Sequence, residues 1–243
     1  MPRPVAILFD LDDTILEASS GSTPAWHAVA GEMAAELGDV GPERVVAAIR
    51  SIADHYWSDP ERHRRGRLDL LGTRRRLVAE ALQLLGLPDT DDLWGRFACR
   101  YAEVRQASLR PFPGALETLQ HFRSLGVRLA LVTNGSGLEQ RAKIEGFGLQ
   151  PCFDCIVVEG EFGMGKPDER VFRHALQALG APRTPETWMV GDNLVWEIAP
   201  CRRLGLHTVW VDWAGAGLPD PCPVEPDRTV RAICELVGHD GRP

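Results

Sequence analysis

The stretch Val5-Ala-Ile-Leu-Phe-Asp-Leu-Asp-Asp-Thr14 joins a short apolar run to a cluster of carboxylates. An apolar run of this length, ending at Phe9, is typical of a strand buried on both faces, as in a parallel sheet. Asp10 and Asp12 are two residues apart, so an extended chain places both carboxylates on one side. Carboxylates this close repel one another unless a cation or a substrate group offsets their charge. On this motif alone, a functional acidic site and a solvated acidic turn are equally good interpretations.

Helical signals fill the long stretch between this strand and the next one. The Thr-Pro pair at residues 23–24, with Thr23 as N-cap, and the Gly-Pro pair at residues 41–42 are typical of helix starts. Further helical patterns cover residues 70–85 and 90–108. The second convincing strand, residues 127–132, comes more than a hundred residues after the first. The intervening segment therefore reads as a helical insertion.

Strands and helices alternate along the rest of the chain. This rhythm predicts a parallel sheet with helices on both faces. We predict an α/β fold with a Rossmann-like parallel sheet core, formed by residues 1–16 and 110–243, and an inserted α-helical domain of residues 17–109. The predicted helices cover residues 115–125, 138–146, 169–179, 195–204 and 229–237, the predicted strands cover residues 127–132, 155–158, 188–190 and 207–211, and residues 215–226 form a Gly- and Pro-rich loop.

Composition narrows the class of protein. The 243 residues are 44% hydrophobic and 25% charged, as in an ordinary globular protein. The formal net charge of −7 speaks against a nucleic-acid partner, since nucleic-acid binders usually carry a basic surface. No apolar run is long enough to span a membrane, and the N-terminal residues lack the features of a signal peptide. We therefore expect a cytoplasmic protein with reduced cysteines and no membrane partner.

Polar residues follow each later strand, where open α/β sheets bind their ligands. Thr133 and Asn134 lead into a helix, which favours either an anion site or a plain helix cap. Lys166, preceded by a Gly-rich loop, is either a cation for phosphate or a solvated surface side chain. It is an unusual choice, since Lys143 is the one other lysine among 27 basic residues. Asp192 is either a carboxylate ligand for Mg²⁺ or a helix cap. The combination favours one site over separate caps.

Four segments, in this order and spacing, resemble the motifs of the haloacid dehalogenase-like (HAD) superfamily. The helical insertion resembles the cap domain of that superfamily, so the resemblance covers essentially the whole chain. The superfamily often has Asp where this chain has Glu197, whose longer side chain could reach a metal through water. The four segments are Phe9-Asp10-Leu11-Asp12-Asp13-Thr14, Val132-Thr133-Asn134-Gly135, Gly165-Lys166-Pro167-Asp168 and Gly191-Asp192-Asn193.

The resemblance implies a Mg²⁺-dependent phosphomonoester hydrolase. It implies that Asp10 attacks phosphorus and forms an aspartyl-phosphate, so that one displacement becomes two. Asp12 would protonate the leaving oxygen and later take a proton from water. Asp10, the backbone carbonyl of Asp12 and Asp192 would hold Mg²⁺. Asp12 also separates this chain from dehalogenases, which resemble it but lack an acid at that position because halide leaves without protonation.

The resemblance also implies which groups bind the substrate. Thr133, the backbone N–H of Asn134 and Lys166 would grip the phosphoryl oxygens. The superfamily's usual range suggests a small phosphorylated metabolite as substrate and a monomer or homodimer as the working form. In the helical insertion, Arg74 shares a helix face with apolar residues, which favours either a packing role or a substrate contact.

Alternative functions stay open from the sequence. A phosphomutase has the same core and would use the same residues. A phospho-receiver domain resembles this chain in its acidic cluster, threonine and lysine, but its phosphoacceptor Asp follows a middle strand, and no such Asp follows an obvious strand between residues 14 and 133. A catalytically silent binding protein on the same fold is a third alternative, although Asp10 and the other motif residues are all present.

Overall fold

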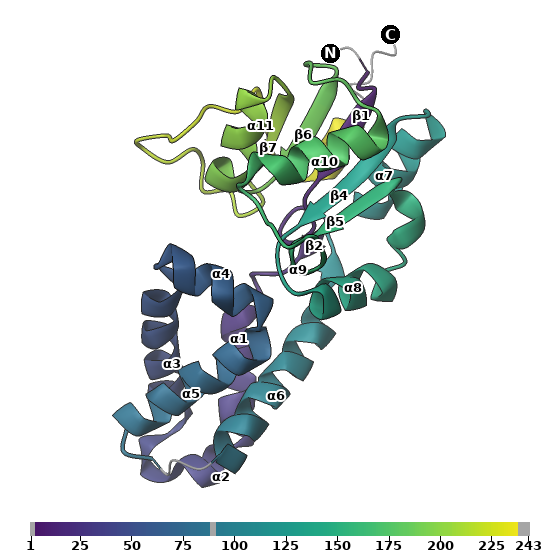
Figure 1. Cartoon of the computed structure of the whole chain (residues 1–243). Helices are drawn as coiled ribbons and strands as arrows, with labels where there is room; N and C mark the ends of the chain where they lie inside the picture. Colours follow the sequence, from purple (N-terminus) through teal and green to yellow (C-terminus); the bar gives the residue numbers. More distant parts are fainter. Residues whose placement is uncertain (1–2, 88–90, 238–243) are drawn as a thin grey trace. The chain divides into compact units, whose positions relative to one another are not determined.

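The computed structural model describes residues 3–87 and 91–237 and contains a six-stranded sheet. The chain divides into two compact units, Met1–Glu17 with Arg110–Pro243, and Ala18–Leu109, here called the α/β unit and the helical unit (Figure 1). Among the described residues, no helix combines the length and apolarity needed to cross a membrane.

All neighbouring strands in the sheet of the α/β unit run parallel, in the order β5-β4-β1-β6-β7-β8. The first strand, β1, therefore lies in the middle of the sheet, as its continuous apolar sequence requires. A short antiparallel pair, β2 (Leu16–Glu17) and β3 (Arg110–Pro111), stands where the chain leaves and re-enters this unit. The strands are β1 (Ala6–Phe9), β4 (Arg128–Thr133), β5 (Cys155–Val158), β6 (Thr187–Gly191), β7 (His207–Val211) and β8 (Arg228–Val230).

Helices cover both faces of the sheet, which confirms the predicted fold class (Figure 1). Successive residues of β1 point to opposite faces. Ile7 and Phe9 pack in the cluster that includes helices α7 (Ala115–Ser124) and α8 (Gly137–Gly146). Ala6 and Leu8 pack in the cluster that includes α10 (Glu169–Leu179) and α11 (Ala199–Arg203). Shorter turns complete the unit: η2 (Gln150–Cys152), α9 (Glu159–Phe162), η3 (Leu194–Ile198) and η4 (Ile233–Leu236).

The helical unit has a hydrophobic core of its own. Apolar residues from α1, α3, α5 and α6 build it, with Phe97 fully buried and Trp26 stacked on Tyr101 at 3.5 Å between ring centroids. Its elements are α1 (Ser22–Glu32), α2 (Ala34–Leu37), η1 (Gly38–Val40), α3 (Pro42–Trp57), α4 (Pro60–Leu68), α5 (Leu70–Leu84) and α6 (Asp91–Ser108).

Some predicted elements are wrong in detail. Residues 229–237 do not form a helix, because Arg228–Val230 pairs with β7 as an edge strand and only the turn η4 follows. The predicted helix 195–204 begins instead as a π-helical turn at Leu194 and continues as α11. Helix α1 starts two residues earlier than its Thr-Pro signal suggests, with Gly21 rather than Thr23 as N-cap. Helix α4 has no counterpart among the predicted helices, and residue 90 lies outside the described residues.

Candidate active site

Strand order explains why residues distant in sequence meet at one edge of the sheet. Asp10 follows β1, and the neighbours of β1 on its two sides are β4, which ends at Thr133, and β6, which ends just before Asp192. The carboxyl ends of these parallel strands therefore point to the same place. Asp10 and Thr133 are buried, at 5% and 2% exposure. Asp10, Thr133 and Asp192 all belong to the α/β unit.

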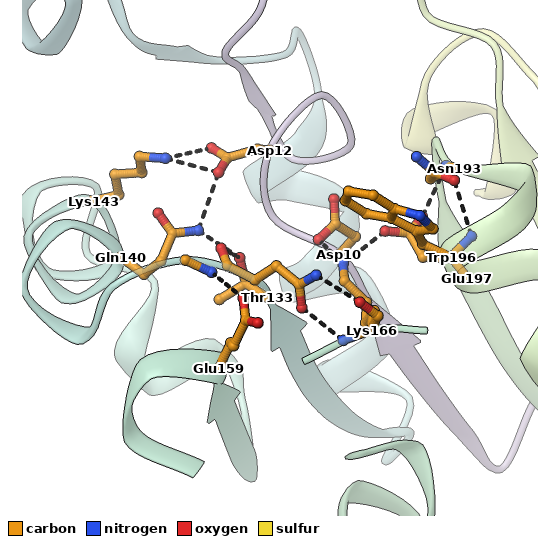
Figure 2. Close-up of polar contacts among 12 residues, drawn as sticks. Asp10, Asp12, Thr133, Gln140, Lys143, Glu159, Lys166, Asn193, Trp196 and Glu197 are labelled. Carbon is orange, nitrogen blue, oxygen red and sulfur yellow. Dashed lines mark hydrogen bonds and ion pairs between the residues drawn. The ribbon is translucent and has the colours of Figure 1, made fainter. Parts of the chain in front are cut away.

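Lys166 is the buried cation of this site (Figure 2). Its Nζ donates to Asp10 Oδ1 and, at 2.6 Å, to Glu197 Oε1. Asn134 holds the backbone of Lys166, since its Oδ1 accepts from the Lys166 N–H at 2.7 Å and its Nδ2 donates to the Lys166 carbonyl at 2.9 Å. The sequence predicted only the backbone N–H of Asn134 as functional. In the structure its side chain fixes the lysine.

Three carboxylates, those of Asp10, Asp192 and Glu197, each offer an oxygen within 4.8 Å of the others. Burial, reinforced by the charge of Glu197 and opposed by Lys166, raises the pKa of Asp10 to about 7. Burial and the charges of Glu197 and Asp10 raise the pKa of Asp192 to about 9. Burial opposes the charge of Lys166 itself, but Asp10 and Glu197 outweigh this and raise the pKa of Lys166.

When ionised, the three carboxylates carry more negative charge than Lys166 offsets. An all-oxygen, strongly acidic donor set is the chemistry that Mg²⁺ prefers. Asp10, Asp192 and Glu197 therefore fit a hard divalent cation, and Glu197 joins the group that the sequence assigned to Asp10, Asp12 and Asp192.

Glu197 reaches this cluster from the π-helical turn that follows Asp192 (Figure 2). Its Oε2 accepts from the Asn193 N–H at 2.9 Å, while its Oε1 accepts from Lys166. A Cβ at Gly191 would clash with Glu197 Oε2, so a larger residue there would displace the Glu197 carboxylate. The side chain of Asn193 caps the turn, with Oδ1 accepting from the N–H groups of Val195 and Trp196. Asn193 thus has a structural role in this turn.

Asp12 is directed toward helix α8 (Figure 2). Its two carboxylate oxygens lie 2.8 and 2.7 Å from Lys143 Nζ. Gln140 Nε2 donates to Asp12 Oδ2 at 3.0 Å and to Thr133 Oγ1 at 2.6 Å. Neither Gln140 nor Lys143 was predicted as a site residue, although the rarity of lysine in this chain was a signal that pointed to Lys143.

A buried glutamate is a further residue that the sequence did not reveal. Glu159, 2% exposed, accepts from the Gly135 N–H at 3.0 Å. A Cβ on Gly165 would lie 2.6 Å from Asn134 Oδ1 and would also strike the Glu159 carboxylate. Residues 159–165 were predicted as a Gly-rich loop, but Glu159–Phe162 form the short helix α9 and only the rest is a loop. The absence of a side chain at Gly165 lets this segment pack closely against Asn134 and Glu159.

The structure brings the predicted site residues of the α/β unit together, and their catalytic roles stay predictions. Arg74 belongs to the helical unit. Its guanidinium carbon lies 5.3 Å from the centroid of the Tyr101 ring, and it lines a cavity of about 290 Å³ within that unit together with Trp26 and Arg50. A substrate contact by Arg74 also stays a prediction.

Sequence and structure comparisons agree with this architecture. A sequence model of the haloacid dehalogenase-like hydrolases matches residues 5–205. A phosphoserine phosphatase from Thermus thermophilus is 33% identical over 251 residues, covering 95% of this chain and 96% of that protein. A glyceraldehyde 3-phosphate phosphatase from Methanocaldococcus jannaschii is 36% identical over 109 residues, but the match covers only 45% of this chain and 47% of that protein.

A solved structure shares the fold along the whole chain. The magnesium-bound crystal structure of the HAD-hydrolase YfnB from Bacillus subtilis superposes with a TM-score of 0.74 at 22% identity, covering 99% of this chain and 100% of that one. The fold, the strand-end site and the family match together define the class: the chain belongs to the haloacid dehalogenase-like hydrolases. The relatives named as phosphatases support an enzyme of the phosphatase branch.

Proposed function

We propose that this chain is a Mg²⁺-dependent phosphomonoester hydrolase that works through an aspartyl-phosphate on Asp10. The observation that carries the proposal is the buried Asp10 carboxylate at the end of the central strand, paired with Lys166 and grouped with Asp192 and Glu197. A nucleophilic carboxylate needs compensating positive charge when it approaches an anionic phosphate. Lys166 supplies part of that charge from a position that the loops hold fixed.

Asp10 is the nucleophile in the first step. A lone pair on its carboxylate oxygen forms a bond to phosphorus while the bond from phosphorus to the leaving oxygen breaks. Asp12 gives its proton to that leaving oxygen. Water then attacks phosphorus, Asp12 accepts the proton of the water, and the bond between phosphorus and Asp10 breaks. The products are the free alcohol, inorganic phosphate and the regenerated carboxylate.

Lys166 and Thr133 hold the phosphoryl oxygens during both steps. Mg²⁺, bound by Asp10, the backbone carbonyl of Asp12 and Asp192, with Glu197 close by, would offset the repulsion between carboxylate and phosphate. The acid at position 12 favours phosphoryl transfer over dehalogenation, because an alkoxide needs a proton to leave and a halide does not.

A small phosphorylated metabolite is the proposed substrate. The names of the relatives, phosphoserine phosphatase and glyceraldehyde 3-phosphate phosphatase, describe phosphate monoesters of small metabolites. Since similar folds act on different substrates, these names support the substrate class and not one compound.

Hydrolysis of p-nitrophenyl phosphate with Mg²⁺, with EDTA and by the Asp10→Asn variant tests the proposal. We expect turnover with Mg²⁺, none with EDTA, and a loss of at least about 1000-fold in the variant, since the nucleophile is removed. Circular dichroism of the variant checks that it is folded. Equal turnover by Asp10→Asn and the unmodified enzyme would overturn the aspartyl-phosphate mechanism, whereas transfer of phosphate between two hydroxyls of one sugar would indicate a phosphomutase.

A further inference from the structure

The two lysines of the chain serve the two proposed catalytic aspartates. Lys166 contacts Asp10, and Lys143 contacts both carboxylate oxygens of Asp12, at 2.8 and 2.7 Å. The remaining basic residues of the chain are arginines. A lysine ammonium is a compact charge with three rotatable donors, which suits a single carboxylate in a confined place. The Lys143 side chain is only 15% exposed, so solvent screens this pair less than a surface pair.

Gln140 joins the carboxylate of Asp12 to the hydroxyl of Thr133 (Figure 2). Gln140 and Lys143 are three residues apart on α8 and so share one helix face. An ionised carboxylate can only accept hydrogen bonds, which fixes the Gln140 amide nitrogen, and not its oxygen, toward Asp12. The other hydrogen of that nitrogen is donated to Thr133 Oγ1 at 2.6 Å. The Thr133 hydroxyl thus accepts from Gln140, and its own hydrogen makes only a long contact, of 3.5 Å, with the Asn134 carbonyl, which a phosphoryl oxygen could replace.

We propose that Gln140 and Lys143 are positioning residues that hold Asp12 and Thr133 as one unit on the face of α8. The inference rests on the proposed function. Gln140, only 2% exposed, sets the distance between the acid and the phosphoryl-binding hydroxyl and directs the Thr133 hydrogen toward a phosphoryl oxygen. Lys143 compensates the negative charge that Asp12 gains when its proton passes to the leaving oxygen. The two positioning residues therefore act on different parts of the reaction.

Leaving-group dependence separates this role from a merely structural one. An alkyl phosphate such as β-glycerophosphate has a poor leaving group and needs the proton from Asp12, whereas p-nitrophenolate leaves with little help. In Lys143→Met we expect kcat for the alkyl ester to fall about tenfold or more beyond any loss for the aryl ester, with KM little changed. Lys143→Arg, which keeps the charge, should recover part of this loss.

Gln140→Leu should behave differently from Lys143→Met. Without the amide the Thr133 hydroxyl can rotate, so its grip on the phosphoryl group weakens for every ester. We expect kcat/KM to fall for both esters, by about tenfold, as is usual for losing a hydrogen bond to a charged group. The alkyl ester should lose somewhat more, because Asp12 is also less well fixed.

Arg141→Met is the matched control. Arg141 lies on the same helix, and its removal takes away the same charge, but its guanidinium contacts Glu161 at 2.8 and 2.7 Å, away from Asp12. We expect both esters to be hydrolysed by this variant at the unmodified rate. Thermal unfolding of every variant shows whether a loss of activity follows from a loss of folded protein.

Three outcomes would overturn the positioning role, and a fourth would count against the proposed function. Equal loss for the two esters in Lys143→Met would overturn the positioning role, as would a rate that matches Arg141→Met. A Lys143→Met variant that hydrolyses the esters faster than the unmodified enzyme would also overturn it. That result would mean that the contact between Lys143 and Asp12 slows the reaction. Failure of the unmodified enzyme to hydrolyse either ester with Mg²⁺ would count against the proposed function itself, and is thereby distinguishable from failure of the positioning role.

Discussion

The strand-end site of the α/β unit and the surface of the helical unit use charged side chains in opposite ways. In the site, Lys166 and Glu197 are each 3% exposed, and one ammonium serves two carboxylates from different elements. In the helical unit, Arg100 binds Glu32 through two parallel contacts of 2.7 and 3.0 Å, with both side chains more than 40% exposed. Exposed pairs contribute little to stability because water and salt screen them, whereas a buried charge left without its partner is costly.

The comparison shows in which region of the chain arginine is suited to its position and in which region lysine is. A planar guanidinium suits two-point contact with one surface carboxylate, and a compact ammonium suits sharing between two buried ones. The chain places both of its lysines in the site and neither in the helical unit. Substitutions in the two regions should therefore differ in effect by orders of magnitude.

The largest effect is expected at Lys166. Lys166→Met should lower kcat about 100- to 1000-fold, the usual cost of removing one donor to developing charge. It should also destabilise the metal-free protein by about 3–5 kcal/mol, because Asp10 and Glu197 stay buried without their cation. Lys166→Arg should restore little, since the larger planar group cannot occupy a position between two carboxylates.

Steady-state hydrolysis of p-nitrophenyl phosphate and urea unfolding in EDTA measure the two losses. Arg100→Met is the control from the helical unit, and should leave both the rate and the unfolding midpoint unchanged, since its pair is exposed. An active Lys166→Arg would break the comparison, because a buried site that accepts arginine does not require the compact shape of lysine.

A smaller effect is expected on how the stability of the protein, with and without Mg²⁺, depends on pH. Burial and neighbouring carboxylates raise the pKa of Asp192 to about 9 and that of Asp10 to about 7. A carboxyl with a raised pKa binds its proton more tightly in the folded state than in the unfolded state. Its stabilising contribution is therefore complete below the unfolded pKa, near 3.8, and is lost as pH rises through the folded value. The metal-free protein should lose this contribution between these limits.

Mg²⁺ should restore the stabilising contribution that is lost when the carboxyls release their protons. The rise in Tm caused by Mg²⁺ should therefore be larger at about pH 8.5 than at about pH 6. Subtracting the EDTA curve from the Mg²⁺ curve removes the contributions of other titrating groups, such as His207. Asp192→Asn should show a smaller rise with a flatter dependence on pH. A rise of the same size at both pH values in the unmodified protein would mean that Mg²⁺ does not replace protons at these carboxyls.

Much of the fold was predictable because it depends on local patterns. Strand β5 and helix α10 have the predicted bounds, since apolar runs and clear caps set them. The C-terminal strand β8 was not predictable from local pattern, because its three residues are extended only through pairing with β7. Tertiary pairing overrides weak local preference in such short segments.

The candidate site was predictable where a reactive or polar side chain directly follows a strand. Asp10 and Thr133 stand at strand ends, and the parallel sheet brings those ends together. Gln140 and Glu159 were not predictable, because a glutamine within a helix and a glutamate in a segment predicted as a loop are usually solvated. Each joins the candidate site through tertiary contacts, Gln140 with Asp12 and Thr133, and Glu159 with the Gly135 N–H.

The smallest effect is expected from substituting arginines of the helical unit, where Arg74 and Arg96 should differ. Arg74 lies over the Tyr101 ring and lines the cavity of about 290 Å³, whereas Arg96 is an exposed partner of Glu36 and Asp92. If Arg74 contacts the substrate, Arg74→Ala should raise KM for the preferred metabolite about tenfold, the cost of one charged hydrogen bond, with kcat little changed.

The same variant should leave KM for p-nitrophenyl phosphate nearly unchanged, because that ester offers no second polar group to bind. Arg96→Ala should alter neither KM nor the midpoint of thermal unfolding, since its partners are exposed. Equal rises in KM for both esters in Arg74→Ala would trace the loss to packing around Tyr101. The contrast between the two regions would then extend to Arg74, whose guanidinium would serve packing against Tyr101 and not binding of the substrate.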